Sequence, residues 1–289
     1  MITYPFTYHA PASIDEAVRA LAASRDAKVL AGGHSLLPLM KLGLARPDAI
    51  VDLRQISALR GIRREADGTI VVGALTTHQT LADDATIQGT LTALADAASL
   101  VGDLQVRSRG TIGGSLAHAD PAADEPAPTL AFDARIRAMG PKGTRDIPAA
   151  EFFRGTFETA LSAGEIVLEI RFPPPPARTG SAYGKFPHPA SRFAVVGVAA
   201  VVTTKADGTI ERAAIGITGA AAAPFGAIAA QRAITGTKGD ANAIAAAAAK
   251  AATGVRLLSD LAASSEYRGN LVAVYTKRAL ERAIERARS

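Results

Sequence analysis

The pattern of apolar and polar positions near the start of the chain predicts a β-α-β unit. Residues 13–16 read Ser-Ile-Asp-Glu, which is the signature of a capping box at a helix start. Apolar residues then recur at helical spacing over residues 17–22. Short apolar runs at residues 28–31 and 49–53 are typical of strands. The first part of the chain is therefore predicted to be a small layered unit.

A second block begins with a hairpin pattern. Residues 59–64 and 69–75 flank an Asp-Gly pair, which favours a tight turn between two strands. Two prolines at residues 126 and 128 restrict a regular helix there to its later part. Further helices are predicted at residues 77–82, 90–101 and 124–132, and further strands at residues 135–139 and 165–172.

Four consecutive prolines at residues 173–176 cannot continue a helix or a strand ladder, so we expect a stiff connector there. Residues 1–175 are predicted to be one domain, with subdomains of about 1–56 and 57–175, and residues 176–289 to be a second domain. In the second domain, strands are predicted at residues 193–204 and 210–217, and helices at residues 227–234, 241–252 and 271–288.

The composition is that of a globular protein and narrows the possible chemistry. Hydrophobic residues make up 48% and charged residues 20% of the 289 residues. The chain contains no cysteine. It therefore has no disulfide, no thiolate zinc site, no cysteine nucleophile and no cysteine-ligated iron–sulfur cluster of its own.

The charge balance and the apolar runs indicate neither a nucleic-acid partner nor a membrane anchor. The net charge is +5, but the basic residues are scattered, aromatic residues are only 5%, and tryptophan is absent. The densest apolar run, residues 193–202, is too short to span a bilayer at about 20 residues per helix. Because the first residues also lack a signal-peptide pattern, we expect a cytoplasmic protein without stable membrane insertion.

Two glycine pairs are the main candidates for a binding function. Gly32-Gly33 is followed by His34-Ser35, and Gly113-Gly114 lies between Thr111 and Ser115. Paired glycines let the backbone approach a ligand and direct successive N–H groups at an anion. Each pair alone is more typical of a tight turn, and neither matches the three-glycine dinucleotide pattern. Together the two loops predict two nests that hold a diphosphate from both sides.

The sequence around these pairs resembles a known family over essentially the whole chain. The matching segments are 31–53, 73–78 (Gly-Ala-Leu-Thr-Thr-His), 102–107, 109–115, 118–124 (His-Ala-Asp-Pro-Ala-Ala-Asp) and 266–268 (Glu-Tyr-Arg). In this order they resemble the medium subunits of carbon monoxide dehydrogenase and related molybdenum hydroxylases. The segment 187–190 departs from the family pattern.

The resemblance implies a fold and a cofactor. The fold is expected to be α+β, of the para-cresol methylhydroxylase type, with two α+β subdomains and a smaller C-terminal α+β domain. The cofactor is expected to be FAD, bound without a covalent bond. Its diphosphate is expected at Gly32, Gly33, His34, Ser35, Thr111, Gly113 and Gly114. The rest of the expected FAD site is Leu36, Gly102, Gly110, Ser115, His118, Asp124, Lys185 near the flavin, and Tyr183 against the isoalloxazine.

The resemblance also implies partners and a role. A large molybdenum-cofactor subunit oxidises the primary substrate, a small [2Fe-2S] subunit carries the electrons, and the FAD held here passes them on. No catalytic residue is expected in this chain. The alternatives are a stand-alone flavin oxidoreductase of the same fold and an interaction protein that has lost FAD. A metal site of His118, Asp120 and Asp124, and purely structural roles for His34 and Tyr183, also remain open, whereas His9 and His78 are expected to be structural.

Overall fold

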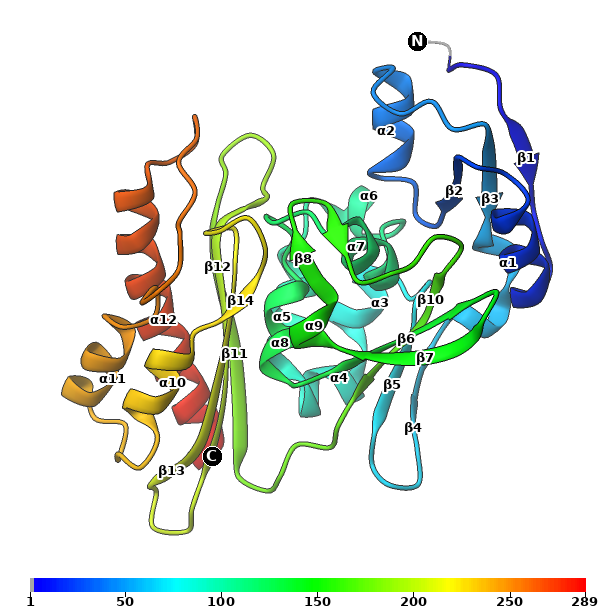
Figure 1. The fold of residues 1–289 in the computed structure, drawn as a ribbon. Coiled ribbons are helices and arrows are strands. Elements are labelled where there is room, and N and C mark those ends of the chain that lie inside the picture. The colour runs from blue at the N-terminus through cyan, green and yellow to red at the C-terminus, as the bar shows by residue number, and fades with distance from the viewer. Residues whose placement is uncertain (1–2) are drawn as a thin grey trace.

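The computed structural model describes residues 3–289, and its first part is the expected β-α-β unit (Figure 1). A parallel three-stranded sheet has the order β1-β3-β2. Half of the predicted capping box is present: Ser13 Oγ accepts a hydrogen bond from the Glu16 N–H at 3.3 Å, but the Glu16 carboxylate accepts the Ala12 N–H at 3.0 Å in place of the Ser13 N–H. The elements are β1 (Thr7–His9), α1 (Ile14–Ala22), β2 (Ala27–Leu30), α2 (Leu36–Lys41) and β3 (Ala49–Asp52). Two short 3-10 helices, Leu53–Gln55 and Ser57–Leu59, lead into the next part.

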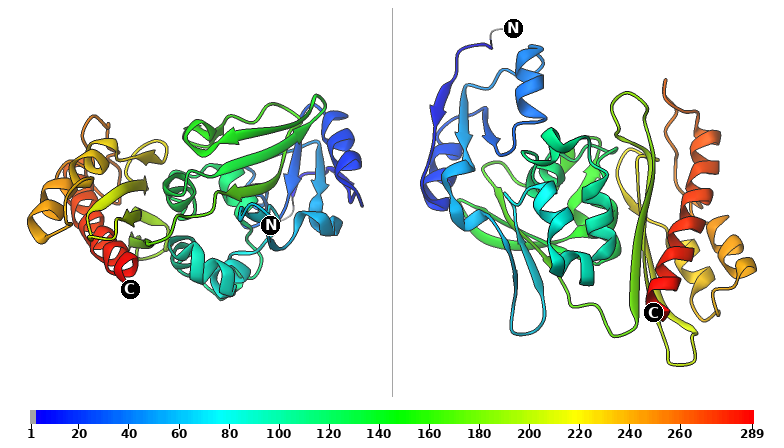
Figure 2. Two further views of the ribbon diagram at one scale, coloured as in Figure 1. Left: turned by 90° about the horizontal axis from the view of Figure 1, so that it is seen from below. Right: turned by 180° about the vertical axis from the view of Figure 1, so that it is seen from behind.

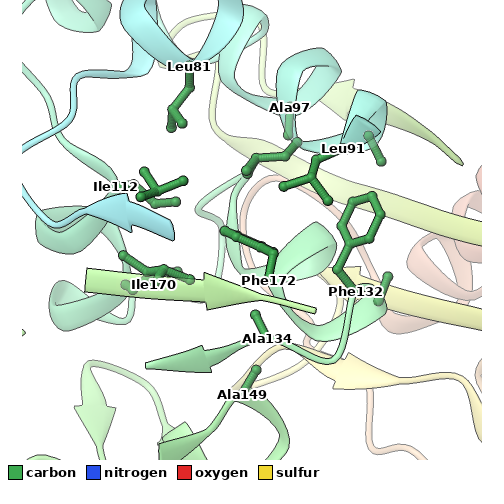
Figure 3. Packing of buried hydrophobic residues seen from close by; sticks show 14 of the residues in the cluster. Leu81, Leu91, Ala97, Ile112, Phe132, Ala134, Ala149, Ile170 and Phe172 are labelled. Atoms are coloured by element: carbon green, nitrogen blue, oxygen red, sulfur yellow. The ribbon is translucent and has the colours of Figure 1, made fainter. Parts of the chain in front are cut away.

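The second part is an antiparallel five-stranded sheet covered by short helices. The sheet has the order β4-β5-β10-β6-β7, and Phe172, Ile170 and Ile112 lie in the packed layer between sheet and helices (Figure 3). The strands are β4 (Ile62–Arg64), β5 (Ile70–Gly73), β6 (Arg135–Gly140), β7 (Gly143–Pro148) and β10 (Ile166–Phe172). The helices are α3 (His78–Asp83), α4 (Ala85–Thr90), α5 (Thr92–Ser99), α6 (Leu104–Arg107), α7 (Ile112–His118), α8 (Pro126–Ala131) and α9 (Ala149–Phe152); a small hairpin joins β8 (Phe153–Gly155) to β9 (Glu158–Thr159).

The C-terminal part is a four-stranded antiparallel sheet of order β11-β12-β13-β14, with helices on one face (Figures 1 and 2). Its elements are β11 (Thr179–Pro187), β12 (Ala194–Thr204), β13 (Ile210–Thr218), β14 (Phe225–Gly226), α10 (Ile228–Ile234), α11 (Ala241–Ala248) and α12 (Ser265–Arg288). The other face packs against α5 and α8. Because both faces are covered, every residue of β12 is buried, and the strand reads as a continuous apolar run.

Polar contacts reinforce this junction between the C-terminal sheet and the helices of the second subdomain. Arg286 of α12 donates to Oδ2 of Asp96 on α5 at 2.8 Å, and Asp96 Oδ2 also accepts the backbone N–H of Tyr183. The backbone N–H of Ala93 donates to Ser181 Oγ at 3.0 Å in a buried setting. The C-terminal sheet is thus fixed against the second subdomain, with which it shares the large core that includes Phe132 and Val201.

The α+β architecture confirms the expected fold class, and the differences concern particular elements. β11 was not predicted because glycines interrupt its apolar pattern; a Cβ on Gly180 would lie 2.2 Å from the Ala283 carbonyl oxygen, so close contact with α12 requires glycine there. The restriction of α8 to its later part is wrong, since α8 starts at Pro126, where a proline is tolerated in the first helical turn. α12 starts before residue 271 because Ser264 caps it.

None of the helices within residues 3–289 has the length and apolar composition needed to cross a membrane. The cytoplasmic location and the division of the chain at the proline run remain predictions.

Candidate functional site

A cavity of about 550 Å³ lies between the first two subdomains, and the loop before β12 reaches its rim. This volume is within the usual range for small-molecule and cofactor sites. All the FAD-binding residues expected from the sequence line it, except Tyr183 and Lys185: Gly32, Gly33, His34, Ser35, Leu36, Gly102, Gly110, Thr111, Gly113, Gly114, Ser115, His118 and Asp124. The fold therefore brings two distant glycine loops to one site.

The first glycine loop presents unused hydrogen-bond donors. Gly33 has φ +82°, a conformation that glycine adopts readily. The backbone N–H groups of residues 32–36 have no acceptor among residues 3–289, although the loop carbonyls of Gly33 and Ser35 accept bonds from α2. A row of unpaired N–H groups along a cavity wall is an anion nest. The nest at the first pair remains a prediction, which these unpaired donors support.

The second glycine pair is not a turn, and its donors are already used. Gly113 and Gly114 lie in the first turn of α7, where Gly113 N–H donates to the Ala74 carbonyl at 2.9 Å and Gly114 N–H to Thr111 Oγ1 at 3.2 Å. A Cβ on Gly113 would lie 2.5 Å from the Ala74 Cβ. Close packing of α7 against Ala74 therefore accounts for the glycine at residue 113. The second loop offers the cavity the Thr111 hydroxyl and not a row of free N–H groups.

The two loops are in direct contact. A Cβ on Gly32 would lie 2.2 Å from the Arg109 carbonyl oxygen and 2.8 Å from the Gly110 Cα, and one on Gly114 would lie 3.8 Å from the Ala31 Cβ. Glycine at residue 32 thus allows the backbone of the first loop to lie on the backbone that leads into α7. The expected convergence of the two loops is what the structure shows.

Asp124 joins the cavity to the C-terminal sheet. Lys185 Nζ donates to Asp124 Oδ2 at 2.8 Å, and Tyr183 Oη donates to Asp124 Oδ1 at 2.7 Å. Burial raises the pKa of Asp124 to about 6, against the opposing effect of Lys185. Burial and the Asp124 charge also raise the pKa of Tyr183 well above its ordinary value, so it remains a donor. Tyr183 and Lys185 thus act behind Asp124, and Tyr183 is 1% exposed rather than on the cavity surface.

Glu125 forms a second buried cluster that the sequence did not reveal. Oε1 of Glu125 contacts His78 Nδ1, and Oε2 accepts the Ser115 hydroxyl at 2.8 Å. Burial opposes ionisation of Glu125, yet His78 and the Ser115 hydroxyl hold its pKa below the ordinary value. His78 and Glu125 both line the cavity, so the structural role expected for His78 includes a place in its wall. In the sequence, only the family resemblance of the Thr-His segment at the start of α3 pointed to His78, and nothing pointed to Glu125.

His118 stacks on an aromatic ring at the cavity edge. Its ring centroid lies 4.9 Å from that of Phe157, and burial lowers its pKa, with the Asp120 charge opposing the shift. Asp120 Oδ1 accepts the Ala122 N–H at 2.9 Å. In the described part of the chain no group of three His, Asp or Glu side chains is placed to hold a metal ion, so His118, Asp120 and Asp124 form no metal cluster there.

Residues 4–175 match the family described as the FAD binding domain in molybdopterin dehydrogenase, and residues 181–283 match the CO dehydrogenase flavoprotein C-terminal domain. The carbon monoxide dehydrogenase medium chain of Hydrogenophaga pseudoflava is 40% identical over 98% of both chains. That of Afipia carboxidovorans is 39% identical over the full length of both.

The chain belongs to the FAD-binding medium subunits of molybdenum hydroxylases. Solved structures show the same fold for this subunit family. A chain of the Cu,Mo-CO dehydrogenase superimposes with a TM-score of 0.95 at 38% identity, covering 99% of this chain and all of that one. A chain of quinoline 2-oxidoreductase from Pseudomonas putida superimposes with a TM-score of 0.93 at 32% identity over the full length of both. These comparisons confirm the expected fold, family and cofactor.

The residues of the cavity fit FAD, the cofactor of this subunit family. The unpaired N–H groups of residues 32–36 are suited to a diphosphate, because an anion satisfies several donors at once. Apolar side chains from all three parts of the chain line the cavity, among them Val29 and Leu39 of the first subdomain, Val167 of the second, and Phe193 of the loop before β12. This chain therefore has both the hydrogen-bond donors and the cavity volume that a dinucleotide requires.

Proposed function

We propose that this chain is the electron-transfer subunit of a heterotrimeric molybdenum hydroxylase. A large molybdenum-cofactor subunit oxidises the primary substrate, and a small [2Fe-2S] subunit delivers the electrons to the FAD bound here, from which they pass to an external acceptor. Relatives named as medium chains or medium subunits support this, among them those of glyceraldehyde dehydrogenase from Sulfolobus acidocaldarius and nicotine 6-hydroxylase from Paenarthrobacter nicotinovorans.

The observation that carries the proposal is the cavity with its row of unpaired donors at residues 32–36. These N–H groups neutralise the diphosphate of FAD, and the Thr111 hydroxyl adds a donor from the second loop. Gly32 keeps a side chain out of the narrow contact between the loops, where an added Cβ would lie 2.2 Å from the Arg109 carbonyl oxygen. When bound, FAD supplies redox chemistry that exchanges electrons one or two at a time.

The buried ionisable groups of the wall support a relay rather than a substrate-converting site. Asp124 is paired with Lys185, and Glu125 is paired with His78. Both oxygens of each carboxylate already contact protein groups, so neither carboxylate is free to abstract a substrate proton. The absence of cysteine means that any iron–sulfur cluster of the assembly belongs to a partner. The chain thus binds and positions the flavin, and the partners supply the remaining redox centres.

The test is anaerobic flavin absorption of the FAD-loaded chain, alone and in the assembly with its small and large subunits. Dithionite should bleach the isolated chain, whereas carbon monoxide, glyceraldehyde, xanthine and quinoline should leave it yellow. In the assembly, the substrate of the large subunit should bleach the flavin. Bleaching of the isolated chain by one of the four substrates would overturn the relay and favour a stand-alone flavin oxidoreductase.

A further inference from the structure

The Ser115 hydroxyl has one proton, and the structure shows where it goes. Ser115 Oγ lies 2.8 Å from Glu125 Oε2, and an ionised carboxylate accepts hydrogen bonds but donates none. The contact between Glu125 Oε1 and His78 Nδ1 favours this ionised form. Ser115 also lines the cavity, so a ligand that contacts its hydroxyl oxygen there meets lone pairs only.

Thr111 lies one helical turn before Ser115 and, unlike Ser115, can donate a hydrogen bond to a ligand. Its Oγ1 accepts the backbone N–H of Gly114 at 3.2 Å, which is the only hydrogen bond of this hydroxyl among residues 3–289, so its own proton is free. Thr111 can therefore donate to an anion, together with the unpaired N–H groups of the first glycine loop. The wall is thus divided into a donor side, formed by residues 32–36 and Thr111, and an acceptor position at Ser115.

A diphosphate has only acceptor oxygens at neutral pH, so it is matched to the donor side and mismatched to Ser115. The donors of FAD are the hydroxyls of its ribose and ribityl groups, the adenine amino group and the N–H of the isoalloxazine. A ligand acceptor placed at Ser115 would face a second acceptor without a proton between them, which is unfavourable in a buried site.

We propose that Ser115 accepts a hydrogen bond from a hydroxyl or N–H group of FAD and makes no diphosphate contact, and that Glu125, held by His78, imposes this polarity. Glu125 and His78 are positioning residues, 1% and 5% exposed, that act on the cofactor through Ser115. This rests on the proposed binding of FAD in the cavity. It also replaces the expectation that the Ser115 hydroxyl is one of the donors to the diphosphate.

The experiment measures the Kd of FAD for the apoprotein by flavin fluorescence, and the competing affinities of ADP and of inorganic pyrophosphate. Ser115→Ala should weaken FAD roughly three- to tenfold, the cost of one hydrogen bond, and leave pyrophosphate unchanged. An unchanged ADP affinity then assigns the donor to the flavin half, and a weakened one to the adenosine half. Equal loss for all three probes, or no loss for FAD, overturns the proposal.

Two controls separate this result from other failures. Ser108→Ala removes an exposed hydroxyl that donates to the Leu104 carbonyl outside the cavity, and it should leave all three affinities unchanged. Wild-type protein that does not bind FAD contradicts the proposed function itself rather than the role of Ser115.

The role of Glu125 is tested by coupling. Glu125→Ala frees the Ser115 proton, so it should weaken FAD in the wild-type background but add little in the Ser115→Ala background. Glu125→Gln keeps an oxygen that accepts the hydroxyl proton and should restore most of the affinity. Equal losses in both backgrounds would mean that Glu125 acts on folding alone and would overturn its positioning role. Should Glu125→Ala not fold, Glu125→Leu, which has no oxygen to accept the hydroxyl proton and leaves a smaller cavity, replaces it in both backgrounds.

Discussion

Lys185 Nζ lies 2.8 Å from Asp124 Oδ2, and this contact connects β11 of the C-terminal sheet to the wall of the cavity proposed to hold FAD. The side chains of both residues are almost fully buried, at 3% and 5% exposure. Lys185 Nζ also donates to the Leu100 carbonyl at 2.7 Å. The charge of Asp124 is thus compensated from a different sheet, so the cavity depends on the C-terminal part of the chain for its electrostatic balance.

Replacing Lys185 by Met should therefore make stability depend on pH. Burial already raises the pKa of Asp124 to about 6, and without the cation it rises further. A raised carboxyl pKa favours the folded state only while the group is protonated, so this contribution is present at low pH and lost as pH rises through the folded pKa. The free energy of unfolding of Lys185→Met should thus fall from pH 5 to pH 8, reaching a deficit of about 3 kcal/mol against wild type, as for other broken buried pairs.

Urea unfolding at pH 5, 6.5 and 8 measures this dependence. Lys238→Met is the matched control, because Lys238 pairs with Asp207 at 3.0 Å on the exposed surface and its loss should change little at any pH. A constant difference between Lys185→Met and wild type across the three pH values would contradict the assignment to Asp124.

Much of the fold could be predicted from the sequence where local signals agree with tertiary packing. Ser13 and Glu16 mark the start of α1, and the uninterrupted apolar run of β12 reflects burial on both faces. β11 could not be recognised, because Gly180 serves the approach of α12 and breaks the strand pattern. Because β11 was not predicted, the relation between Tyr183 and Lys185 was not predicted either. The two residues are two positions apart on this strand, so they share a face and reach the same carboxylate.

The candidate site could be predicted only in part. The glycine loops were visible, but their difference in donor use depends on Ala74 and Thr76, whose carbonyls accept the N–H groups at the start of α7. The contact between Glu125 and His78 depends on the tertiary packing of α3 and α8, for which one sequence offers no pairing signal. The family resemblance predicted which residues form the site, and the structure shows which of them have free hydrogen-bond donors and which can only accept.

Gly33→Val should abolish or strongly weaken FAD binding. Gly33 has φ +82°, which a β-branched residue adopts only with strain, and an added Cβ would lie 2.9 Å from Leu37 Cδ1. The loop must therefore shift, and several N–H donors lose their common direction. We expect the Kd of FAD to rise roughly tenfold or more, since each lost hydrogen bond costs about 0.5–1.5 kcal/mol.

Gly61→Val is the control for backbone strain. Gly61 has φ +95° and no atom within 4 Å of an added Cβ, and it lies outside the cavity. Both variants should lose some thermal stability, but only Gly33→Val should lose flavin, as judged from the ratio of absorbance at 450 nm to that at 280 nm. Normal flavin content in Gly33→Val would count against the first loop as the diphosphate site.

FAD should be released intact when the protein is denatured. No cysteine is present to form a thioether, and the family resemblance implies no bond through His or Tyr. After acid precipitation and centrifugation, the yellow colour should remain in the supernatant and behave as FAD in chromatography. Colour that stays with the pellet would show a covalent flavin and contradict this prediction.

The last prediction concerns Thr218, which ties the C-terminal sheet to the segment before Asp124. Thr218 Oγ1 lies 2.8 Å from the Pro121 carbonyl and 2.7 Å from the Ala123 carbonyl, and Thr218 is 1% exposed. Thr218→Val keeps the shape but leaves these carbonyls without the hydroxyl donor. The expected cost is about 1–2 kcal/mol in the free energy of unfolding.

Because residues 121–123 lead directly into Asp124, Thr218→Val should also weaken FAD binding, by a factor of roughly three to ten if one cofactor contact is lost. Thr203→Val is the matched control: Thr203 is buried in the same sheet, but its hydroxyl pairs with Thr179 at 2.8 Å, away from the cavity. It should lower stability without changing the Kd of FAD. If the two variants lose the same stability and both keep wild-type FAD affinity, the wall before Asp124 is held by other contacts. A loss of affinity in Thr218→Val alone shows that the C-terminal sheet shapes a cofactor site formed by the other two subdomains.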